Sequence, residues 1–243
     1  MRFDEFRKAY LQSPATALLA FDFDGTLAPI VPTPEQAQLD SRLRQPLARL
    51  SNLTNVIVIS GRPTHYLERQ FQGIDIRLIG NYGRPETLEP PNQRLLATLV
   101  AQAHEELPAA ILLETKPSSL ALHYRRAPAL APDVLCWARR QARKHDVTLD
   151  FGKSVVEVTL GDHSDKGTVL RRLAGDHSPV LYAGDDLGDI PALEALQDLK
   201  LPSCGLAVTS EQTPAELSMI ADESVSRSTF VRYLISLASV QAS

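Results

Sequence analysis

The chain has 243 residues, of which 44% are hydrophobic and 22% are charged, and its formal net charge is −4 at pH 7. A chain of this length and composition can bury a large core, which excludes global disorder. The charge balance, with no extended basic run, excludes nucleic acid as the expected partner. One domain, or a core that carries an insertion, remains open.

The cysteine pattern and the hydropathy indicate the compartment. Cys136 and Cys204 are far apart and belong to no CxxC pair, which predicts neither a disulfide framework nor a thiol zinc site. No segment reaches 18 consecutive apolar residues, and the acidic N-terminal residues do not fit a signal peptide. We therefore expect a cytoplasmic protein without a membrane partner.

The first part of the chain alternates between strand and helix signals. Residues 17–23 are a nearly continuous apolar run, typical of a parallel strand buried on both faces. Residues 35–50 carry apolar side chains at helical spacing, and β-branched residues at 55–60 predict a second strand. A helix at 64–71 and a strand at 76–80 follow. This alternation predicts an open parallel α/β sheet.

The middle of the chain changes character. Helical patterns are separated there by short strand-like runs, two of which are joined by the turn Lys116-Pro117-Ser118. The predicted elements are a helix at 93–106, strands at 111–115 and 119–125, a helix at 133–144, and strands at 147–151 and 155–159. This order predicts an antiparallel sheet with two helices.

The parallel pattern then resumes to the end of the chain. The predicted elements are a helix at 166–173, a strand at 180–183, a helix at 190–196, a strand at 206–208 and a helix at 229–237. The sequence thus predicts an α/β fold in which a Rossmann-like parallel-sheet core, residues 1–83 and 162–243, is interrupted by an α+β domain at 84–161.

Three polar clusters directly follow predicted strands of the core. They are DFDGT at 22–26, SGR at 60–62 and GDDLGD at 184–189. Open α/β sheets bind ligands at the carboxyl ends of their strands. We therefore expect the three clusters to line one site.

The pair Asp22 and Asp24 suits covalent phosphoryl transfer. On an extended backbone, carboxylates two residues apart can point to the same side. One nucleophile and one proton carrier are what a two-step transfer requires. An Asp-rich strand end that only makes a turn or caps a helix is the alternative. The combination D-x-D-G-T after a buried strand favours the chemical interpretation.

The charges expected at this site require a cation. The acidic side chains that would converge are Asp22, Asp24, Asp185, Asp186 and Asp189, against Arg62 and Lys166. Carboxylates that lie within several ångströms repel one another and would reject a phosphate. A hard divalent cation resolves this conflict, and carboxylate, water and phosphate oxygens are the ligands that Mg²⁺ prefers.

These motifs carry a family resemblance. DFDGT, Ser60 after a strand, Lys166 and GDDLGD resemble the four ordered motifs of the haloacid dehalogenase (HAD) superfamily. More narrowly, the chain resembles trehalose-6-phosphate phosphatases over most of its length. The matching stretches are FDFDGTLAPI, VISGRP, ETKPSSLALHYR, GKSVVEV, DKG and AGDD.

The resemblance implies a Mg²⁺-dependent phosphatase in which residues 1–83 and 162–243 are the catalytic core and residues 84–161 a specificity cap. Asp22 would form an aspartyl-phosphate and Asp24 would act as acid and base. Ser60 and Lys166 would bind the transferring phosphoryl group. The metal ligands implied are Asp22, the backbone carbonyl of Asp24 and Asp185, with Asp186 or Asp189 in support.

The resemblance also implies a set of substrate-binding residues. They are Thr26, Gly61, Arg62, Glu114, Lys116, His123, Arg125 and Glu157, of which His123 and Arg125 match a strand that supports the cap site. The alternative for the residues in the insertion is that they only lie on the solvent-exposed face of a sheet that is covered on one side.

Departures from the family pattern leave the sugar open. The family has Gly-x-His-Gly where this chain has Tyr82 in place of the histidine, and Thr-Asp-Glu where it has Gly188 and Ile190 beside Asp189. Trehalose 6-phosphate is the leading substrate. The alternatives are another glycosyl phosphate (glucosylglycerol phosphate or a glycosyl-phosphoglycerate), a phosphomutase and a non-catalytic sugar-phosphate sensor. Oligomeric state is not readable from the sequence.

Overall fold

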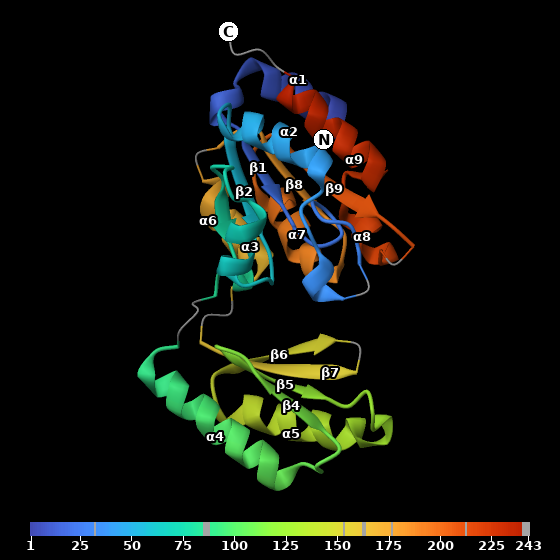
Figure 1. The fold of residues 1–243 in the computed structure, drawn as a ribbon. Helices are drawn as coiled ribbons and strands as arrows, with labels where there is room; N and C mark the ends of the chain where they lie inside the picture. The colour runs from blue at the N-terminus through green and yellow to red at the C-terminus, as the bar shows by residue number, and fades with distance from the viewer. Residues whose placement is uncertain are drawn as a thin grey trace. The chain divides into compact units, whose positions relative to one another are not determined.

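The computed structural model describes residues 1–31, 33–84, 88–152, 154–161, 164–175, 177–211 and 213–239. The chain divides into two compact units (Figure 1). Unit 1 comprises Met1–Gly83 and Ser164–Ser243, and unit 2 comprises Arg84–His163. Each unit has its own sheet and its own hydrophobic core. The catalytic and specificity roles assigned to the two parts of the chain stay predictions.

Unit 1 is built on a six-stranded sheet in which every neighbouring pair is parallel. The strand order is β10 (Glu223–Ser226), β9 (Ser203–Thr209), β8 (Val180–Gly184), β1 (Leu18–Phe21), β2 (Asn55–Ile59) and β3 (Arg77–Ile79). From β1 the chain builds outward to β2 and β3, and later returns to β8 on the other side of β1. The direction of strand addition therefore reverses between β1 and β8.

Helices cover both faces of this sheet. One core cluster joins the sheet to α1 (Phe3–Gln12), α2 (Ser41–Ser51), α3 (Thr64–Gln70) and α9 (Arg227–Ala238). The other joins it to α6 (Lys166–Ala174), α7 (Ile190–Asp198) and α8 (Ala215–Ile220). Double coverage explains why the central strands read as apolar runs, since both faces of each strand are buried.

Strand β1 illustrates how the sequence feeds both cores. Successive side chains of a strand point to opposite faces. Leu19 and Phe21 accordingly pack in the first cluster, whereas Leu18 and Ala20 pack in the second. All four residues are buried.

Unit 2 is an antiparallel sheet with two helices. The strand order is β4 (Leu112–Thr115), β5 (Ser119–His123), β7 (Val155–Leu160) and β6 (Val147–Gly152). Helices α4 (Pro90–Glu106) and α5 (Ala131–Lys144) share one apolar cluster with the sheet, to which Leu122 and Val158 contribute. By strand alternation, Glu114 and Glu157 lie on the opposite face.

The predicted α/β class with an inserted antiparallel unit is confirmed. The helix predicted over 35–50 begins late, because Asp40 caps α2 and accepts the backbone N–H of Arg42. The strand predicted over 119–125 ends at His123, and Arg125 lies in the following turn. Elements that the sequence did not predict are α1, α8 and β10.

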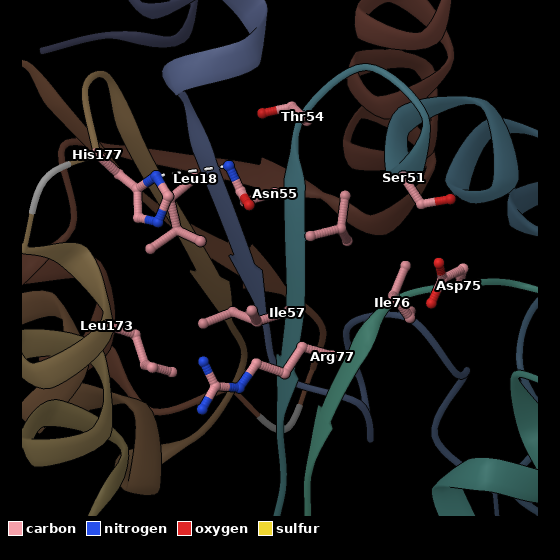
Figure 2. A pocket seen from close by; sticks show the side chains of 11 residues that line it. Leu18, Ser51, Thr54, Asn55, Ile57, Asp75, Ile76, Arg77, Leu173 and His177 are labelled. Carbon is pink, nitrogen blue, oxygen red and sulfur yellow. Dashed lines mark hydrogen bonds between the residues drawn. The ribbon is translucent and has the colours of Figure 1, made fainter.

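A pocket of about 300 Å³ opens at the amino-terminal ends of β1 and β2, away from the strand ends that carry Asp22 (Figure 2). Its lining mixes apolar side chains such as Leu18 and Ile57 with polar ones such as Asn55 and His177. No helix in the described ranges has the length and apolar character needed to cross a membrane. Cys136 and Cys204 are both free thiols.

Candidate active site

Three adjacent strands of unit 1 end in polar residues along one edge of the sheet. Asp22 follows β1, Ser60 follows β2 and Asp185 follows β8. Because β8, β1 and β2 are neighbours and parallel, these side chains lie at the same edge. This edge is also where the direction of strand addition reverses, the usual position of a ligand crevice in open α/β sheets.

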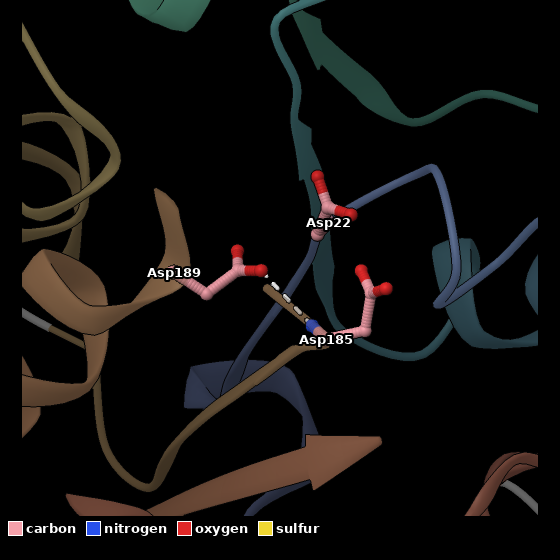
Figure 3. Close-up of side chains that lie close together, drawn as sticks. All are labelled: Asp22, Asp185 and Asp189. Carbon is pink, nitrogen blue, oxygen red and sulfur yellow. Dashed lines mark hydrogen bonds between the residues drawn. The ribbon is translucent and has the colours of Figure 1, made fainter. Parts of the chain in front are cut away.

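Asp22, Asp185 and Asp189 form a carboxylate cluster there (Figure 3). One oxygen from each lies within 4.8 Å of the others. Burial, followed by the charges of Asp189 and Asp186, raises the pKa of Asp185 to about 7. Burial also raises the pKa of Asp22 well above its ordinary value, although Lys166 opposes the shift. A hard divalent cation would offset this excess negative charge, so the donor set fits such an ion.

Lys166 lies among these carboxylates. Its Nζ donates to Asp22 Oδ1 at 2.7 Å and to Asp189 Oδ1 at 2.6 Å, and its side chain is 4% exposed. Burial disfavours the charged ammonium, but Asp189 and Asp22 outweigh burial and raise the pKa of Lys166 well above its ordinary value. The amine is therefore a fixed positive charge beside the proposed nucleophile.

Asp189 is the anchor of this arrangement. Besides Lys166, its Oδ1 accepts the hydroxyl of Tyr182, and its Oδ2 accepts the backbone N–H groups of Asp185 and Asp186 at 2.9 and 3.0 Å. Burial opposes its ionisation, but Lys166 and these hydrogen bonds outweigh burial and lower the pKa of Asp189. Asp186 is exposed and caps the short 3₁₀ helix Leu187–Asp189 by accepting the Gly188 N–H.

Two glycines are needed for the carboxylates to come this close. Gly25 has φ +75°, and a Cβ there would lie 1.9 Å from an Asp185 oxygen. A Cβ on Gly184 would lie 2.1 Å from the Asp189 carboxylate carbon. A side chain at either position would displace a member of the cluster.

Asp24 has a different cation from Asp22. The Nε and Nη2 of Arg62 donate to the two carboxylate oxygens of Asp24 at 2.8 and 2.7 Å. The two carboxylates of the DFDGT motif thus contact different cations, Asp22 that of Lys166 and Asp24 that of Arg62.

The loop after β2 completes the edge. Ser60 is buried, and its Oγ accepts the backbone N–H of Arg62 at 3.1 Å. The missing side chain of Gly61 leaves room for the phenol of Tyr82, whose ring centroid lies 6.0 Å from Lys166 Nζ. Thr26 is fully buried, and its Oγ1 has no hydrogen-bond partner among the described residues.

The predicted sugar-binding residues belong to unit 2. Glu114 bonds to His123 at 2.8 Å across β4 and β5. Lys116 donates to Glu157 at 2.9 Å, and Ser119 donates to the other oxygen of that carboxylate. Burial opposes ionisation of Glu157, but Ser119 and Lys116 outweigh it and lower the pKa of its carboxyl. Arg125 is exposed in the turn after β5.

Tyr182 is the residue of this site that sequence reasoning missed. It lies in β8, in an apolar run where an aromatic side chain reads as ordinary core. Only the hydrogen bond to Asp189 distinguishes it, and that contact depends on the turn between β8 and α7. No local sequence signal could have found it.

Comparison with known proteins places the chain in a family. The trehalose-phosphatase family model matches residues 20–224. A trehalose-phosphate phosphatase of Mycolicibacterium paratuberculosis is 31% identical over 198 residues, which cover 73% of this chain and 50% of that protein. A bifunctional trehalose-6-phosphate synthase/phosphatase of Thermoproteus tenax is 29% identical over 71% of this chain and 26% of its own length. This chain thus matches half or less of these relatives.

Solved structures share the fold. The trehalose-6-phosphate phosphatase of Aspergillus fumigatus aligns with a TM-score of 0.77 at 23% identity, over 98% of this chain and 97% of that one. A haloacid dehalogenase-like hydrolase of Bacteroides thetaiotaomicron aligns with a TM-score of 0.63 at 12% identity, over 91% and 99%. The fold is therefore HAD-like. Because the family model spans most of the sequence, this chain belongs to the trehalose-phosphatase family.

Proposed function

We propose that this protein is a Mg²⁺-dependent phosphatase that hydrolyses trehalose 6-phosphate to trehalose and phosphate through an aspartyl-phosphate. The observation that carries the proposal is the buried contact of Asp22 with Lys166 beside Asp185, in a chain of the trehalose-phosphatase family. A carboxylate, a fixed positive charge and a further carboxylate lie together at the carboxyl ends of β1 and β8, and this arrangement supports the assignment of Asp22 as nucleophile.

Asp22 is the proposed nucleophile. An oxygen of its carboxylate attacks phosphorus, a new O–P bond forms and the bond from phosphorus to the sugar oxygen breaks. Lys166 and Ser60 bind the phosphoryl oxygens and offset their charge during transfer. Lys166 suits this role because its charge is already fixed by Asp189.

Asp24 is the proposed acid and base. In the first step its carboxylic acid form gives a proton to the departing sugar oxygen and becomes the carboxylate. In the second step this carboxylate takes a proton from the water that attacks phosphorus. The bond from phosphorus to the Asp22 oxygen breaks, and inorganic phosphate leaves with Asp22 and the acid form of Asp24 restored. Its side chain is 46% exposed, which leaves it accessible to a bound substrate.

We propose Asp22, the backbone carbonyl of Asp24 and Asp185 as the ligands of Mg²⁺. The ion, when bound, supplies charge neutralisation for the carboxylates and the phosphate. Asp186 and Asp189 support this set. The four hydrogen bonds that Asp189 accepts favour a role through Lys166 and the loop backbone.

We assign sugar recognition to the polar face of the unit 2 sheet. Glu114, Lys116 and Glu157 are the proposed contacts to sugar hydroxyls or phosphate, with His123 holding Glu114. Arg125 and, in unit 1, Thr26 and Gly61 complete the proposed substrate set. The two free cysteines support a reducing cytoplasm as the compartment.

A panel of phosphate esters tests the substrate. Phosphate release with Mg²⁺ should be fastest from trehalose 6-phosphate and slower from glucosylglycerol phosphate and simple hexose phosphates. The Asp22→Asn variant, purified in parallel, gives the background of contaminating phosphatases. Equal rates for trehalose 6-phosphate and hexose phosphates would contradict the substrate assignment. An isomerised sugar phosphate product would instead indicate a mutase, and binding without turnover a sensor.

Metal removal tests the cofactor. Treatment with a chelator should abolish phosphate release, and added Mg²⁺ should restore it, because the carboxylate cluster would otherwise repel the phosphate. Full activity in excess chelator would contradict the proposed metal dependence.

A further inference from the structure

The contact between Arg62 and Asp24 has the geometry of a positioning device. Both carboxylate oxygens of Asp24 accept from the guanidinium, at 2.7 and 2.8 Å, in the bidentate arrangement that fixes direction as well as distance. A half-exposed aspartate would otherwise sample several rotamers. This contact selects one of them.

Arg62 is the fixed member of the pair. Its side chain is 17% exposed, whereas that of Asp24 is 46% exposed. The guanidinium carbon lies 4.7 Å from the centroid of the Tyr66 ring, and the Tyr66 hydroxyl donates to the backbone carbonyl of Ala37. The aromatic face thus packs against the cation and supports it.

The backbone of Arg62 is held as well. Its N–H donates to Ser60 Oγ at 3.1 Å, and its carbonyl accepts the N–H of Asn81 at 2.9 Å. The loop after β2 therefore links the guanidinium to Ser60, the proposed phosphate contact.

The hydrogen bonds do not favour Arg62 as a phosphate ligand. Two of its three nitrogens, Nε and Nη2, are directed at Asp24. Lys166 is the cation that contacts the proposed nucleophile, at 2.7 Å from Asp22. Each carboxylate of the pair thus has its own cation, Lys166 beside Asp22 and Arg62 beside Asp24.

We propose that Arg62 is a positioning residue that acts through Asp24. It orients the carboxylate that takes a proton from water and, with one of the two hydrogen bonds released, the carboxylic acid that gives a proton to the leaving oxygen. This inference rests on the proposed phosphatase function and on the role of Asp24 in it. It differs from the sequence-based expectation that Arg62 binds substrate. In the first step, which kcat/KM reports, Arg62 then matters only for substrates whose leaving group needs a proton, whereas in the second step it affects hydrolysis of the aspartyl-phosphate from any substrate.

Leaving-group dependence tests this directly. A sugar alkoxide needs protonation as it departs, whereas p-nitrophenolate departs with little help. Arg62→Gln should lower kcat/KM for trehalose 6-phosphate about 10- to 100-fold. The loss in kcat/KM for p-nitrophenyl phosphate should be smaller than this by a factor of at least about ten. Arg62→Lys keeps the charge without the bidentate geometry, so it should show the same imbalance. Circular dichroism of both variants establishes that they fold.

A double-mutant cycle distinguishes action of Arg62 through Asp24 from action that is independent of Asp24. Adding Arg62→Gln to Asp24→Asn should change kcat/KM by less than about threefold, because Arg62 then has no acid to position. Arg69→Gln is the matched control, since Arg69 also lies against the Tyr66 ring, at 5.9 Å, but is not bonded to Asp24. We expect this control to behave as wild type with both esters.

Other results would overturn the inference. Equal losses with both esters, together with weaker competitive inhibition by inorganic phosphate, would make Arg62 a phosphate ligand. A double variant far worse than Asp24→Asn would show independent action. If the wild-type protein hydrolyses neither ester in Mg²⁺, the proposed function fails together with the inference, whereas an active wild type without the imbalance refutes the inference alone.

Discussion

The buried hydroxyl of Tyr182 takes part in the hydrogen-bond network of the candidate site. Its ring lies in the second core cluster, and its hydroxyl donates to Asp189, which in turn holds Lys166 against Asp22. A hydrogen bond to a charged group contributes more than one between neutral groups. Tyr182 therefore links the core of unit 1 to the charge that faces the proposed nucleophile.

Tyr182→Phe should reduce both stability and turnover. Losing one of the four donors to buried Asp189 is expected to cost about 1–3 kcal/mol in the free energy of unfolding. The less restrained Lys166 should reduce kcat roughly tenfold. Thermal or urea unfolding measures the first effect, and phosphate release the second.

Tyr10→Phe is the matched control for this substitution. Tyr10 is also fully buried in unit 1, but its hydroxyl has no hydrogen-bond partner among the described residues. Its removal should leave activity unchanged and stability unchanged or higher. If both variants behave alike, the hydrogen bond from Tyr182 to Asp189 has no special role.

At the scale of elements, the Asp40 carboxylate caps helix α2 and connects it to helix α9. It caps α2 by accepting the Arg42 N–H at 2.9 Å, and its Oδ2 accepts from Arg42 Nη2 and Arg227 Nη1 at 2.7 and 2.8 Å. Arg227 begins α9, so this carboxylate joins two helices that cover the same face of the sheet. Hydrogen bonding to Arg42 and then to Arg227 outweighs burial and holds the pKa of Asp40 well below its ordinary value.

The depressed pKa gives this contribution a pH dependence. A carboxyl whose pKa is lower in the folded state stabilises the protein above its unfolded pKa, near 3.9, and that contribution is lost as the pH falls toward the folded value. Asp40→Asn should therefore destabilise by about 1–2 kcal/mol at pH 7, with a smaller difference from wild type at pH 3. Urea unfolding at several pH values measures it.

Asp165→Asn provides the comparison for Asp40→Asn. Asp165 also caps a helix, α6, by accepting a backbone N–H, from Thr168 at 2.6 Å, but no arginine in the described ranges is bonded to it. Asparagine is as good a cap, so we expect little change at either pH. A pH-independent loss in Asp40→Asn would contradict the charge-based explanation.

At the level of elements, the sequence predicted those whose burial produces a clear apolar pattern. The central strands are buried on both faces, so their apolar runs marked them in the sequence. Strand β10 has one buried residue, Val225, which is too little to form a pattern. The start of α2 depends on the Asp40 cap, which lies within a longer run of helical spacing.

The same contrast holds for the candidate site. Motif position after a strand was enough to group Asp22, Asp185 and Asp189, because parallel strand ends share an edge. The partner of Arg62 was not predictable, because it depends on the direction of a long side chain between the loops that follow β1 and β2. Which residues act, and how, stays a prediction in every case.

The whole molecule combines two units with separate cores. Unit 2 contains the single tryptophan of the chain, Trp137, which is 3% exposed within the core of that unit. Its fluorescence therefore reports on unit 2, whereas far-ultraviolet circular dichroism reports on both units. Separate cores predict separate responses to mutation.

A pair of Leu→Ala substitutions tests this. Leu122 and Leu47 are both fully buried, the first in unit 2 and the second in unit 1. Leu122→Ala should destabilise unit 2 by about 2–5 kcal/mol and shift the Trp137 transition. Leu47→Ala should shift the circular dichroism transition and leave the Trp137 midpoint in place. Coincident shifts of both signals in both variants would mean that the chain unfolds as one cooperative unit.

The central claim is that Asp22 carries phosphoryl transfer in a phosphatase of trehalose 6-phosphate. The most direct measurement is phosphate release from trehalose 6-phosphate in Mg²⁺ by wild type and by Asp22→Asn, with circular dichroism confirming that both are folded. We predict turnover by wild type and a loss of at least about 10³-fold in the variant, because the amide cannot act as the nucleophile. Release by Asp22→Asn at a rate near that of wild type would contradict the account.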